Sequence, residues 1–248
     1  MGLDMKRVLL RVAYDGTNYC GWQVQPNAVT IEGVLNRELS ALLKEEIVVI
    51  GASRTDSGVH ALGNVAVFDT NNRIPAEKIS YALNQRLPED IVIQESREVA
   101  LDFHPRHCDT RKTYEYRIYN ATFPMPTKRR YSHFVYYDLD VEAMKEGASY
   151  LVGEHDFVSF CSVNTQVKDT IRTIEDITII RKDQDIIIRI QGNGFLYNMV
   201  RIIAGTLIQV GNHMVEPKKV GWMLEQKNRT FAGPTAPAKG LTLVKIEY

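Results

Sequence analysis

The order of strand-like and helix-like segments constrains the fold of this chain more than any other feature. Residues 8–14 alternate apolar with other side chains before an Asp-Gly turn signal, which predicts a strand. Residues 31–43 repeat apolar side chains at helical spacing behind Thr30, a good capping residue, and predict a helix. Two apolar, β-branched runs, 47–52 and 63–70, then predict two strands.

A second helix and a further strand complete this half of the chain. We place Pro75 at the first helical position, because its missing N–H is tolerated there, and Pro88 as the stop signal. Apolar residues between these two prolines recur at helical spacing, and residues 91–94 predict the next strand. The resulting order, β-α-β-β-α-β, is that of the ferredoxin-like fold.

The second half repeats this order with different residues. The expected elements are a strand at 112–119, a helix from Asp140 that ends at Gly153, strands at 174–182 and 185–192, an apolar helix at 195–210, a short inserted helix at 218–226 and a strand at 241–248. We therefore expect an α+β protein of two tandem ferredoxin-like (RRM-like) units, residues 1–105 and 106–248, with mainly antiparallel sheets. Sheets joined edge to edge would leave a central cleft near residues 100–112.

Charge and cysteine content point to an ordinary protein of the reducing cytoplasm. The 30 basic and 30 acidic residues cancel, yet residues 104–130 hold seven Lys or Arg and only two Asp or Glu. Three widely spaced cysteines form no C-x-x-C pair, which argues against disulfides or a zinc site. The N-terminus lacks a signal-peptide pattern, and the apolar stretch 195–210 is too short for a membrane span and carries Arg201.

The sharpest chemical motif is the segment GASRTDSGVHALG, residues 51–63. Arg54 and Asp56 stand two apart in a loop of small residues between two predicted strands. On an R-x-D pattern alone, the ordinary explanation is an Asx-turn at Asp56 with a solvated Arg54 beside it. A catalytic carboxylate is the competing explanation, and the wider sequence favours it.

The segment GASRTDSGVHA resembles the G-x-G-R-T-D-x-G-V-H-A motif of the TruA family of tRNA pseudouridine synthases. Six more blocks resemble that family in its order: YDGTNYCGWQ (14–23), KTYEYRIYN (112–120), GEHDFVSFC (153–161), QVKDTIRTI (166–174), GNGFLYNMVRIIAGTL (192–207) and APAKGLTL (236–243). The resemblance spans the chain from about Lys6. Ser53 and Ser57 replace the usual Gly or Ala, and residues 104–112 depart from the family pattern.

The resemblance implies isomerisation of uridine to pseudouridine in the anticodon stem-loop of tRNA, with no cofactor and no metal. It makes Asp56 the nucleophilic carboxylate on a flipped-out uridine. Three routes stay open: attack on C1′, addition to C6 of the ring, or departure of the uracil through a glycal. Each needs an ionised carboxylate, whose pKa nearby cations would hold down. The resemblance also implies a homodimer that holds the anticodon arm.

Three further residues receive roles from the resemblance. Arg201 lies in a helix that is apolar on nearly every face, so its guanidinium needs an anionic or strongly polar partner unless it reaches solvent. The resemblance makes that partner Asp56. It also makes Arg54 an RNA-engaging residue and Tyr114 the aromatic that stacks on the flipped uracil and helps to remove the C5 proton. Tyr116, two residues on, is expected to be a packing residue.

Clustered cations are the expected RNA-binding surface, because stem recognition consists largely of phosphate contacts. With Tyr114, the expected contacts are Arg54, Arg106, Arg111, Lys112, Lys128, Arg129, Arg130, Lys168 and Arg172. His104, His107 and Cys108 lack a nearby fourth ligand, so we expect no metal there. A non-catalytic RNA-binding protein would have no use for Asp56 beside phosphates, and a small-molecule hydrolase lacks a general base to assist Asp56.

Overall fold

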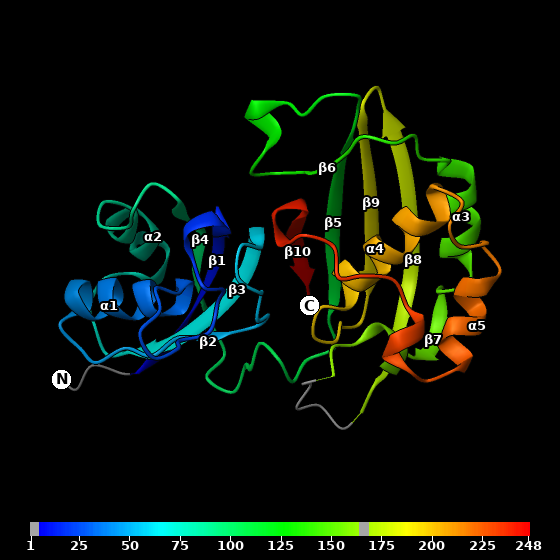
Figure 1. Ribbon diagram of the computed structural model, residues 1–248. Coiled ribbons are helices and arrows are strands. Elements are labelled where there is room, and N and C mark those ends of the chain that lie inside the picture. Colours follow the sequence, from blue (N-terminus) through cyan, green and yellow to red (C-terminus); the bar gives the residue numbers. More distant parts are fainter. Residues whose placement is uncertain (1–4, 164–168) are drawn as a thin grey trace. The chain divides into compact units, whose positions relative to one another are not determined.

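The computed structural model describes residues 5–163 and 169–248, and the chain divides into two compact units (Figure 1). The first unit takes the chain up to Thr110 together with Leu243–Tyr248, and the second is Arg111–Thr242. Both are mixed α+β. The strand pairs described below are antiparallel, apart from one parallel pair in the second unit. Among the helices of the described ranges, none is long and apolar enough to cross a membrane.

The first unit shows the predicted order of elements. These are β1 (Lys6–Tyr14), α1 (Ile31–Leu43), β2 (Ile50–Gly51), β3 (His60–Thr70), α2 (Ala76–Asn84) and β4 (Ile91–Val99). The strand β1 lies between β3 and β4, and β2 pairs with β3. Thr30 caps α1 as expected, accepting a hydrogen bond from the N–H of Gly33.

Two boundaries in this unit differ from the prediction. The strand expected at 47–52 is only Ile50–Gly51, because the N–H groups of Ile47 and Val49 donate instead to α1 side chains, Ser40 Oγ and Asn36 Oδ1, at 2.9 Å each. Pro75 precedes α2 as its N-cap rather than forming its first residue. Both faces of the sheet are apolar: Val8 and Leu10 are fully buried, and a cluster around Leu9, Val65 and Val67 covers the opposite face.

The second unit contains more elements than the predicted repeat. Its elements are β5 (Arg111–Asn120), β6 (His133–Val135), α3 (Val141–Ser149), β7 (Gly153–Asp156), β8 (Ile171–Lys182), β9 (Asp185–Gly192), α4 (Met199–Gly211), α5 (Lys219–Glu225) and the start of the chain's last strand, β10 (Leu241–Glu247), whose residues from Leu243 on belong to the first unit. The strand order is β5-β9-β8-β7, and β6 runs parallel to β5. The short strands β6 and β7 were not predicted, because three or four residues carry too little periodicity.

Two helix ends in this unit differ from the sequence prediction. The helix α3 ends at Ser149, and Gly153, expected to be its stop, instead opens β7 with a φ of +113°. The apolar helix begins at Met199 rather than at residue 195, because Asn198 takes a left-handed conformation with a φ of +61°. The remaining predicted strands and helices of this half lie within a few residues of their expected positions.

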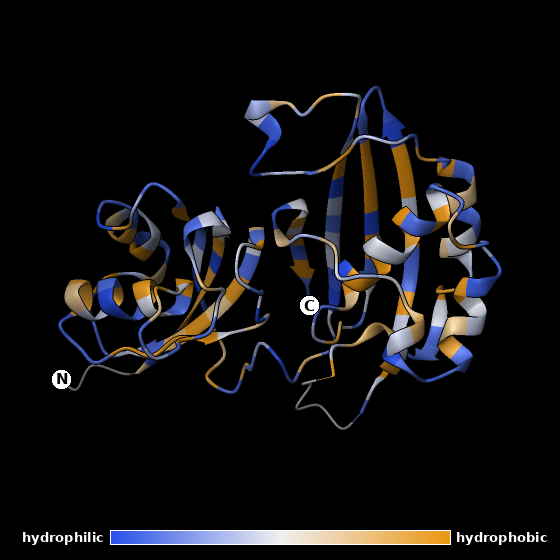
Figure 2. Ribbon diagram, viewed as in Figure 1, coloured by the Kyte–Doolittle hydropathy of each residue, from blue (hydrophilic) through white to orange (hydrophobic). Residues whose placement is uncertain are grey.

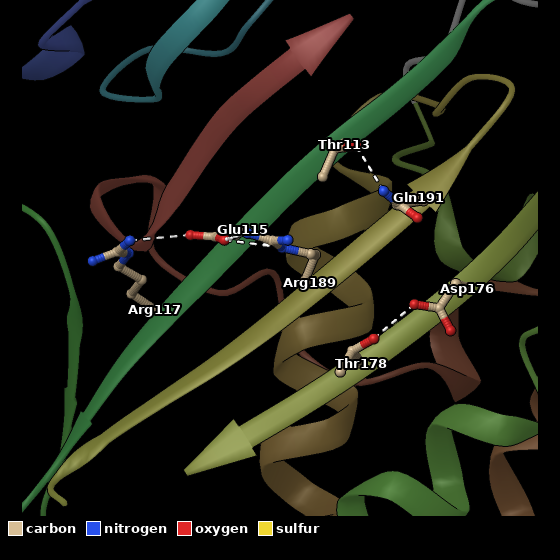
Figure 3. Close-up of polar contacts among 7 residues, drawn as sticks. All are labelled: Thr113, Glu115, Arg117, Asp176, Thr178, Arg189 and Gln191. Atoms are coloured by element: carbon tan, nitrogen blue, oxygen red, sulfur yellow. Dashed lines mark hydrogen bonds and ion pairs between the residues drawn. The ribbon is translucent and has the colours of Figure 1, made fainter. Parts of the chain in front are cut away.

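The two faces of the second unit's sheet differ in polarity. One face packs on α4, where Ile186, Ile188 and Ile190 are fully buried, and Figure 2 shows apolar residues along β8 and β9. The other face is polar. Figure 3 shows Glu115 between Arg117 and Arg189, Thr113 beside Gln191, and Asp176 beside Thr178. The predicted alternation along β5, with Glu115 opposite in direction to Tyr114 and Tyr116, is therefore confirmed.

Glu115 is expected to contribute stability that depends on pH. Burial raises the pKa of its carboxyl, but hydrogen bonds from Arg189 at 3.0 Å and Arg117 at 3.1 Å outweigh burial, so the net pKa is lowered. A lowered pKa in the folded state stabilises the protein above the unfolded pKa, and this stabilisation disappears as the pH falls. Glu115→Gln should reduce the free energy of unfolding by about 1–3 kcal/mol at neutral pH.

Urea denaturation at a series of pH values checks this prediction. The difference between wild type and Glu115→Gln should shrink as the pH falls below about 4.3, the pKa of glutamate in the unfolded chain, and disappear once the folded carboxyl is also protonated. Thr178→Val is the control, because it removes the exposed Thr178–Asp176 hydrogen bond from the same face. A deficit for Glu115→Gln that stays constant with pH would contradict the assignment.

Candidate active site

The loop between β2 and β3, residues 52–59, positions Asp56. Buried contacts fix its first two residues: the Ala52 N–H donates to the Val65 carbonyl at 2.7 Å, and Asn64 Nδ2 donates to the Ser53 carbonyl at 3.0 Å. The Val59 N–H donates to the Asp56 carbonyl at 3.1 Å and closes a turn. Arg54 is exposed and Asp56 is partly exposed. The loop therefore presents both side chains from a backbone held by hydrogen bonds.

The segment that follows β1 supports this loop directly. The Trp22 N–H donates to the Thr55 carbonyl at 3.0 Å, and the Tyr14 hydroxyl lies 2.7 Å from Thr55 Oγ1. The Tyr19 carbonyl accepts from the Gly58 N–H at 3.3 Å and from Ser57 Oγ at 3.2 Å. Two motifs that are 37 residues or so apart in sequence thus form one structure, which explains why YDGTNYCGWQ accompanies R-T-D.

Two glycines of this segment are required by the close approach of the loop. A Cβ on Gly16 would lie 2.0 Å from the Val59 carbonyl oxygen. A Cβ on Gly21 would lie 2.6 Å from the Thr55 carbonyl oxygen, and the φ of Gly21 is +83°. The loop can approach this segment only where side chains are absent.

Gly16→Ala should therefore displace the loop and reduce activity more than it reduces stability. We expect a loss of about 2 kcal/mol or more in unfolding free energy, typical of overpacking, with a larger fall in kcat than rise in KM. Gly147→Ala in α3 is the control, because its nearest neighbours are side-chain methyls at 3.3 Å or more. Thermal melts and steady-state kinetics of both variants test this, and unchanged kcat in Gly16→Ala would contradict it.

His60, which has no role by resemblance, has a structural position here. Its Nδ1 lies 3.1 Å from the Gly16 amide nitrogen and 3.1 Å from Asp15 Oδ1, and the ring is buried. The ring thus connects the start of β3 to the turn after β1. No local sequence signal marks this contact, because it joins residues 44 apart.

Tyr114 lies in the second unit, on the face of β5 that packs on α4. It is 7% exposed, and its ring meets Phe195 edge-to-face with centroids 5.3 Å apart. Tyr116 is fully buried and its hydroxyl donates to the Pro237 carbonyl at 2.9 Å. Burial raises the pKa of Tyr116 well above its usual range. The predicted packing role of Tyr116 is therefore confirmed, and Phe195 is a neighbour of Tyr114 that the sequence analysis missed.

Arg201 lies in the first turn of α4 and is half-buried. Its Nε donates to the Ala236 carbonyl and its Nη1 to Asn198 Oδ1, both at 2.8 Å. Asn198 in turn donates to Ser162 Oγ at 2.8 Å. The guanidinium is thus oriented by the start of α4 and by the segment before β10. Asp56 belongs to the other unit, and its pairing with Arg201 stays a prediction.

The expected RNA-binding cations lie in different surroundings. Arg54 and Arg106 are exposed, Lys112 is half-buried, and Arg130 is exposed. Others make local contacts: Arg111 with Glu175 at 2.5 Å, Lys128 with Asp185, Arg129 with the Pro126 carbonyl at 2.9 Å and Arg172 with the Asp169 carbonyl at 3.2 Å. Lys168 lies outside the described residues.

The histidines near the end of the first unit show no metal-binding arrangement. The rings of His104 and His107 are stacked, with centroids 3.7 Å apart, and Cys108 Sγ contacts the His104 carbonyl at 3.4 Å. Burial and neighbouring positive groups, including Arg106, lower the pKa of His104. In the part of the chain that the structure describes, no three His, Cys, Asp or Glu side chains are grouped to hold a metal ion.

Comparisons with known proteins agree with this geometry. A family model described as tRNA pseudouridine synthase matches residues 11–107 and 148–248, which include the Asp56 loop and α4. The chain is 51% identical over 244 residues to tRNA pseudouridine synthase A of Thermoanaerobacter sp. strain X514, 48% to that of Acetivibrio thermocellus and 45% to that of Brevibacillus brevis. Each alignment covers 98% of this chain and all of the relative.

These matches place the chain in a class of isomerases that convert uridine to pseudouridine in tRNA. The chain belongs to the tRNA pseudouridine synthase family. The predicted family and enzyme class are confirmed. A solved structure described as an archaeal box H/ACA sRNP Nop10-Cbf5 complex also aligns to 95% of the chain and 45% of the other chain, at a TM-score of 0.38 and 11% identity.

Proposed function

We propose that this enzyme isomerises uridine to pseudouridine in the anticodon stem-loop of tRNA, with Asp56 as the nucleophilic carboxylate. The observation that carries the proposal is the support of the Asp56 loop by residues 14–22, both within the stretch that the family model matches. A loop with fixed backbone can hold a carboxylate in the orientation that catalysis needs. The Asx-turn explanation accounts for neither the supporting segment nor the family match.

The proposed reaction needs no external reactant. The N1–C1′ glycosidic bond of uridine breaks, a C5–C1′ bond forms, the C5 proton is removed and N1 gains a proton, so substrate and product are isomers. Asp56 contributes through attack on C1′, through addition to C6, or by assisting departure of the uracil as a glycal forms. Each route uses the ionised carboxylate. No residue of this scheme requires a metal or an organic cofactor.

We propose supporting roles for three other residues by resemblance to the family. Arg201 would pair with Asp56, and the hydrogen bonds that orient its guanidinium are consistent with a fixed cation. Tyr114 would stack on the flipped uracil and assist removal of the C5 proton. Arg54, which is exposed on the Asp56 loop, would engage RNA through its planar guanidinium. The remaining predicted cations would contact phosphates.

The finer architecture and assembly are also proposals. The β4-β1-β3-β2 arrangement of the first unit supports a ferredoxin-like fold, and we propose the same fold, with an added β6, β7 and α5, for the second. We further propose a cleft where the units meet, a homodimer that holds one anticodon arm between its subunits, and a cytoplasmic location. Sedimentation equilibrium giving an active monomer at micromolar concentration would contradict the dimer.

Tritium release tests the proposed activity. Purified protein is incubated with tRNA transcripts that carry [5-³H]uridine, because pseudouridine formation releases the C5 hydrogen to water. We expect stoichiometric release, and mass spectrometry of the product should place pseudouridine in the anticodon stem-loop. Binding of tRNA without tritium release would instead support the non-catalytic RNA-binding alternative, and release from uridines elsewhere in tRNA would contradict the proposed position.

A further inference from the structure

Residues 121–137, which follow β5 and include β6, differ in composition from the rest of the chain. We call this segment the β5–β6 arm. Its 17 residues include five aromatics and three Lys or Arg, and no Asp or Glu, in a chain whose basic and acidic residues cancel. The arm also lies between the two stretches, 11–107 and 148–248, that the family model matches.

Hydrogen bonds hold the base of the arm in place. The Ala121 N–H donates to the Val135 carbonyl at 3.2 Å, and Asn120 Nδ2 donates to the carbonyls of Val135 and Tyr137 at 3.0 and 2.8 Å. The short helical turn Pro126–Lys128 is attached to the sheet, because Lys128 pairs with Asp185 and lies over the ring of Tyr119. Figure 1 shows the arm extending away from the strands of its unit.

Large side chains of the arm point to solvent. Phe123 is 77% exposed and Tyr136 is 71% exposed, and Met125 and Tyr131 are also exposed. Lys128 pairs with Asp185, and Arg129 is exposed on the same arm. An exposed Phe123 ring does not gain the hydrophobic free energy that burial of its apolar surface would provide. Its position therefore points to a partner that covers it.

Exposed aromatic rings beside arginines are the chemistry that binds unpaired nucleotides. Bases stack on aromatic rings whatever their identity, and arginine contacts the phosphates between them. The arm itself contains no carboxylate to balance its cations. A protein partner would need acidic groups at matching positions, whereas RNA carries a negative charge at every nucleotide. The absence of Asp and Glu from residues 121–137 therefore favours RNA.

We propose that the β5–β6 arm binds unpaired nucleotides of the tRNA substrate, with Phe123 and Tyr136 stacking on bases and Arg129 contacting a phosphate. This inference rests on the proposed function, since it takes tRNA as the ligand. It goes beyond that function by assigning base stacking to residues outside the catalytic loop. The arm supplies affinity, and the chemical step belongs to Asp56.

Variants of the arm test this proposal. Fluorescence anisotropy measures the dissociation constants of full-length tRNA and of a ten-nucleotide oligouridine over a series of salt concentrations. Phe123→Ala and Tyr136→Ala should each weaken both ligands roughly five- to a hundredfold without changing the salt dependence, since stacking is uncharged. Arg129→Ala should reduce the slope of log Kd against log salt by about one. The matched control is Tyr81→Ala, which removes a 70% exposed tyrosine beside Lys78 on α2.

Two further measurements separate stacking from general damage. Phe123→Trp should restore binding and Phe123→Leu should not, because leucine keeps apolar bulk but has no ring. At saturating tRNA, the single-turnover rate of Phe123→Ala and Tyr136→Ala should equal that of wild type. Wild-type tritium release decides the proposed function separately from these binding data.

Three results would overturn the proposal. Wild-type affinity for both RNAs in Phe123→Ala and Tyr136→Ala would show that the arm does not stack on bases. Equal binding by Phe123→Leu and wild type would assign the site to apolar contact alone. The third result is a sedimentation coefficient of RNA-free Phe123→Ala or Tyr136→Ala that differs from that of wild type, together with unchanged affinity for oligouridine. This result would show that the arm contacts another protein chain.

Discussion

Asp56→Asn should abolish pseudouridine formation, with a fall of at least about a thousandfold in the single-turnover rate, while tRNA affinity stays near that of wild type. The amide keeps the size of the carboxylate but loses its nucleophilicity and its charge. The loop backbone should stay in place, because the Val59 N–H donates to the Asp56 carbonyl and the Trp22 N–H donates to the Thr55 carbonyl, and the substitution removes neither bond. Tritium release measures the rate and filter binding measures the affinity.

Asp69→Asn is the matched control for this variant. Asp69 lies on β3 of the same unit and pairs with Arg7 at 2.7 Å, where it raises the pKa of the guanidinium by accepting its hydrogen bonds. The same chemical change there should lower stability slightly and leave the rate unchanged. Turnover near wild type in Asp56→Asn would reject Asp56 as the catalytic group, whatever the control shows.

Arg201→Leu should have the second-largest effect, through the chemical step rather than through RNA binding. If Arg201 pairs with Asp56, its loss removes the cation that keeps the carboxylate ionised and oriented. A partly buried carboxylate without its cation has a higher pKa, so the residual rate should rise with pH over a range in which the wild-type rate is flat. A rate-against-pH profile at saturating tRNA measures this.

The same variant should also lose stability. Leucine leaves the Ala236 carbonyl and Asn198 Oδ1 without the donor that Arg201 supplies. Losing hydrogen bonds to a charged group lowers the free energy of unfolding by about 1–3 kcal/mol. Water can replace part of this loss, because the position is half-buried. Arg181→Leu is the control, because Arg181 similarly donates to Asn120 Oδ1 and to the Leu139 carbonyl. That variant should lose stability and keep the wild-type pH profile.

Arg54→Ala separates binding from catalysis within the same unit as Asp56. Its guanidinium is exposed, so the substitution should weaken productive RNA engagement and leave the melting temperature unchanged. A stable Arg201→Leu protein with a wild-type pH profile would place Arg201 away from Asp56.

Long strands and helices were predictable because the spacing of their apolar residues marks the face that each element buries. The helix α1 and the strand β9 match the predicted ranges, and β1 and β8 contain theirs in full. Short elements were not predictable in this way. The strands β6 and β7 exist because distant partners, β5 and β8, supply their hydrogen bonds. Residues 47–49 are outside the strand because α1 side chains accept hydrogen bonds from the N–H groups of Ile47 and Val49.

The candidate site likewise has some features that local sequence predicts and others that depend on contacts between distant residues. The candidate residues Arg54, Asp56, Tyr114 and Arg201 could be predicted from the sequence, because their motifs occur in the order of the family that the chain resembles. The support of the Asp56 loop by residues 14–22, the Phe195 ring against Tyr114 and the carbonyl of Ala236 at Arg201 could not. Only tertiary structure decided these contacts, because each joins residues 33 to 81 positions apart, and their approach depends on packing and not on local conformational preference.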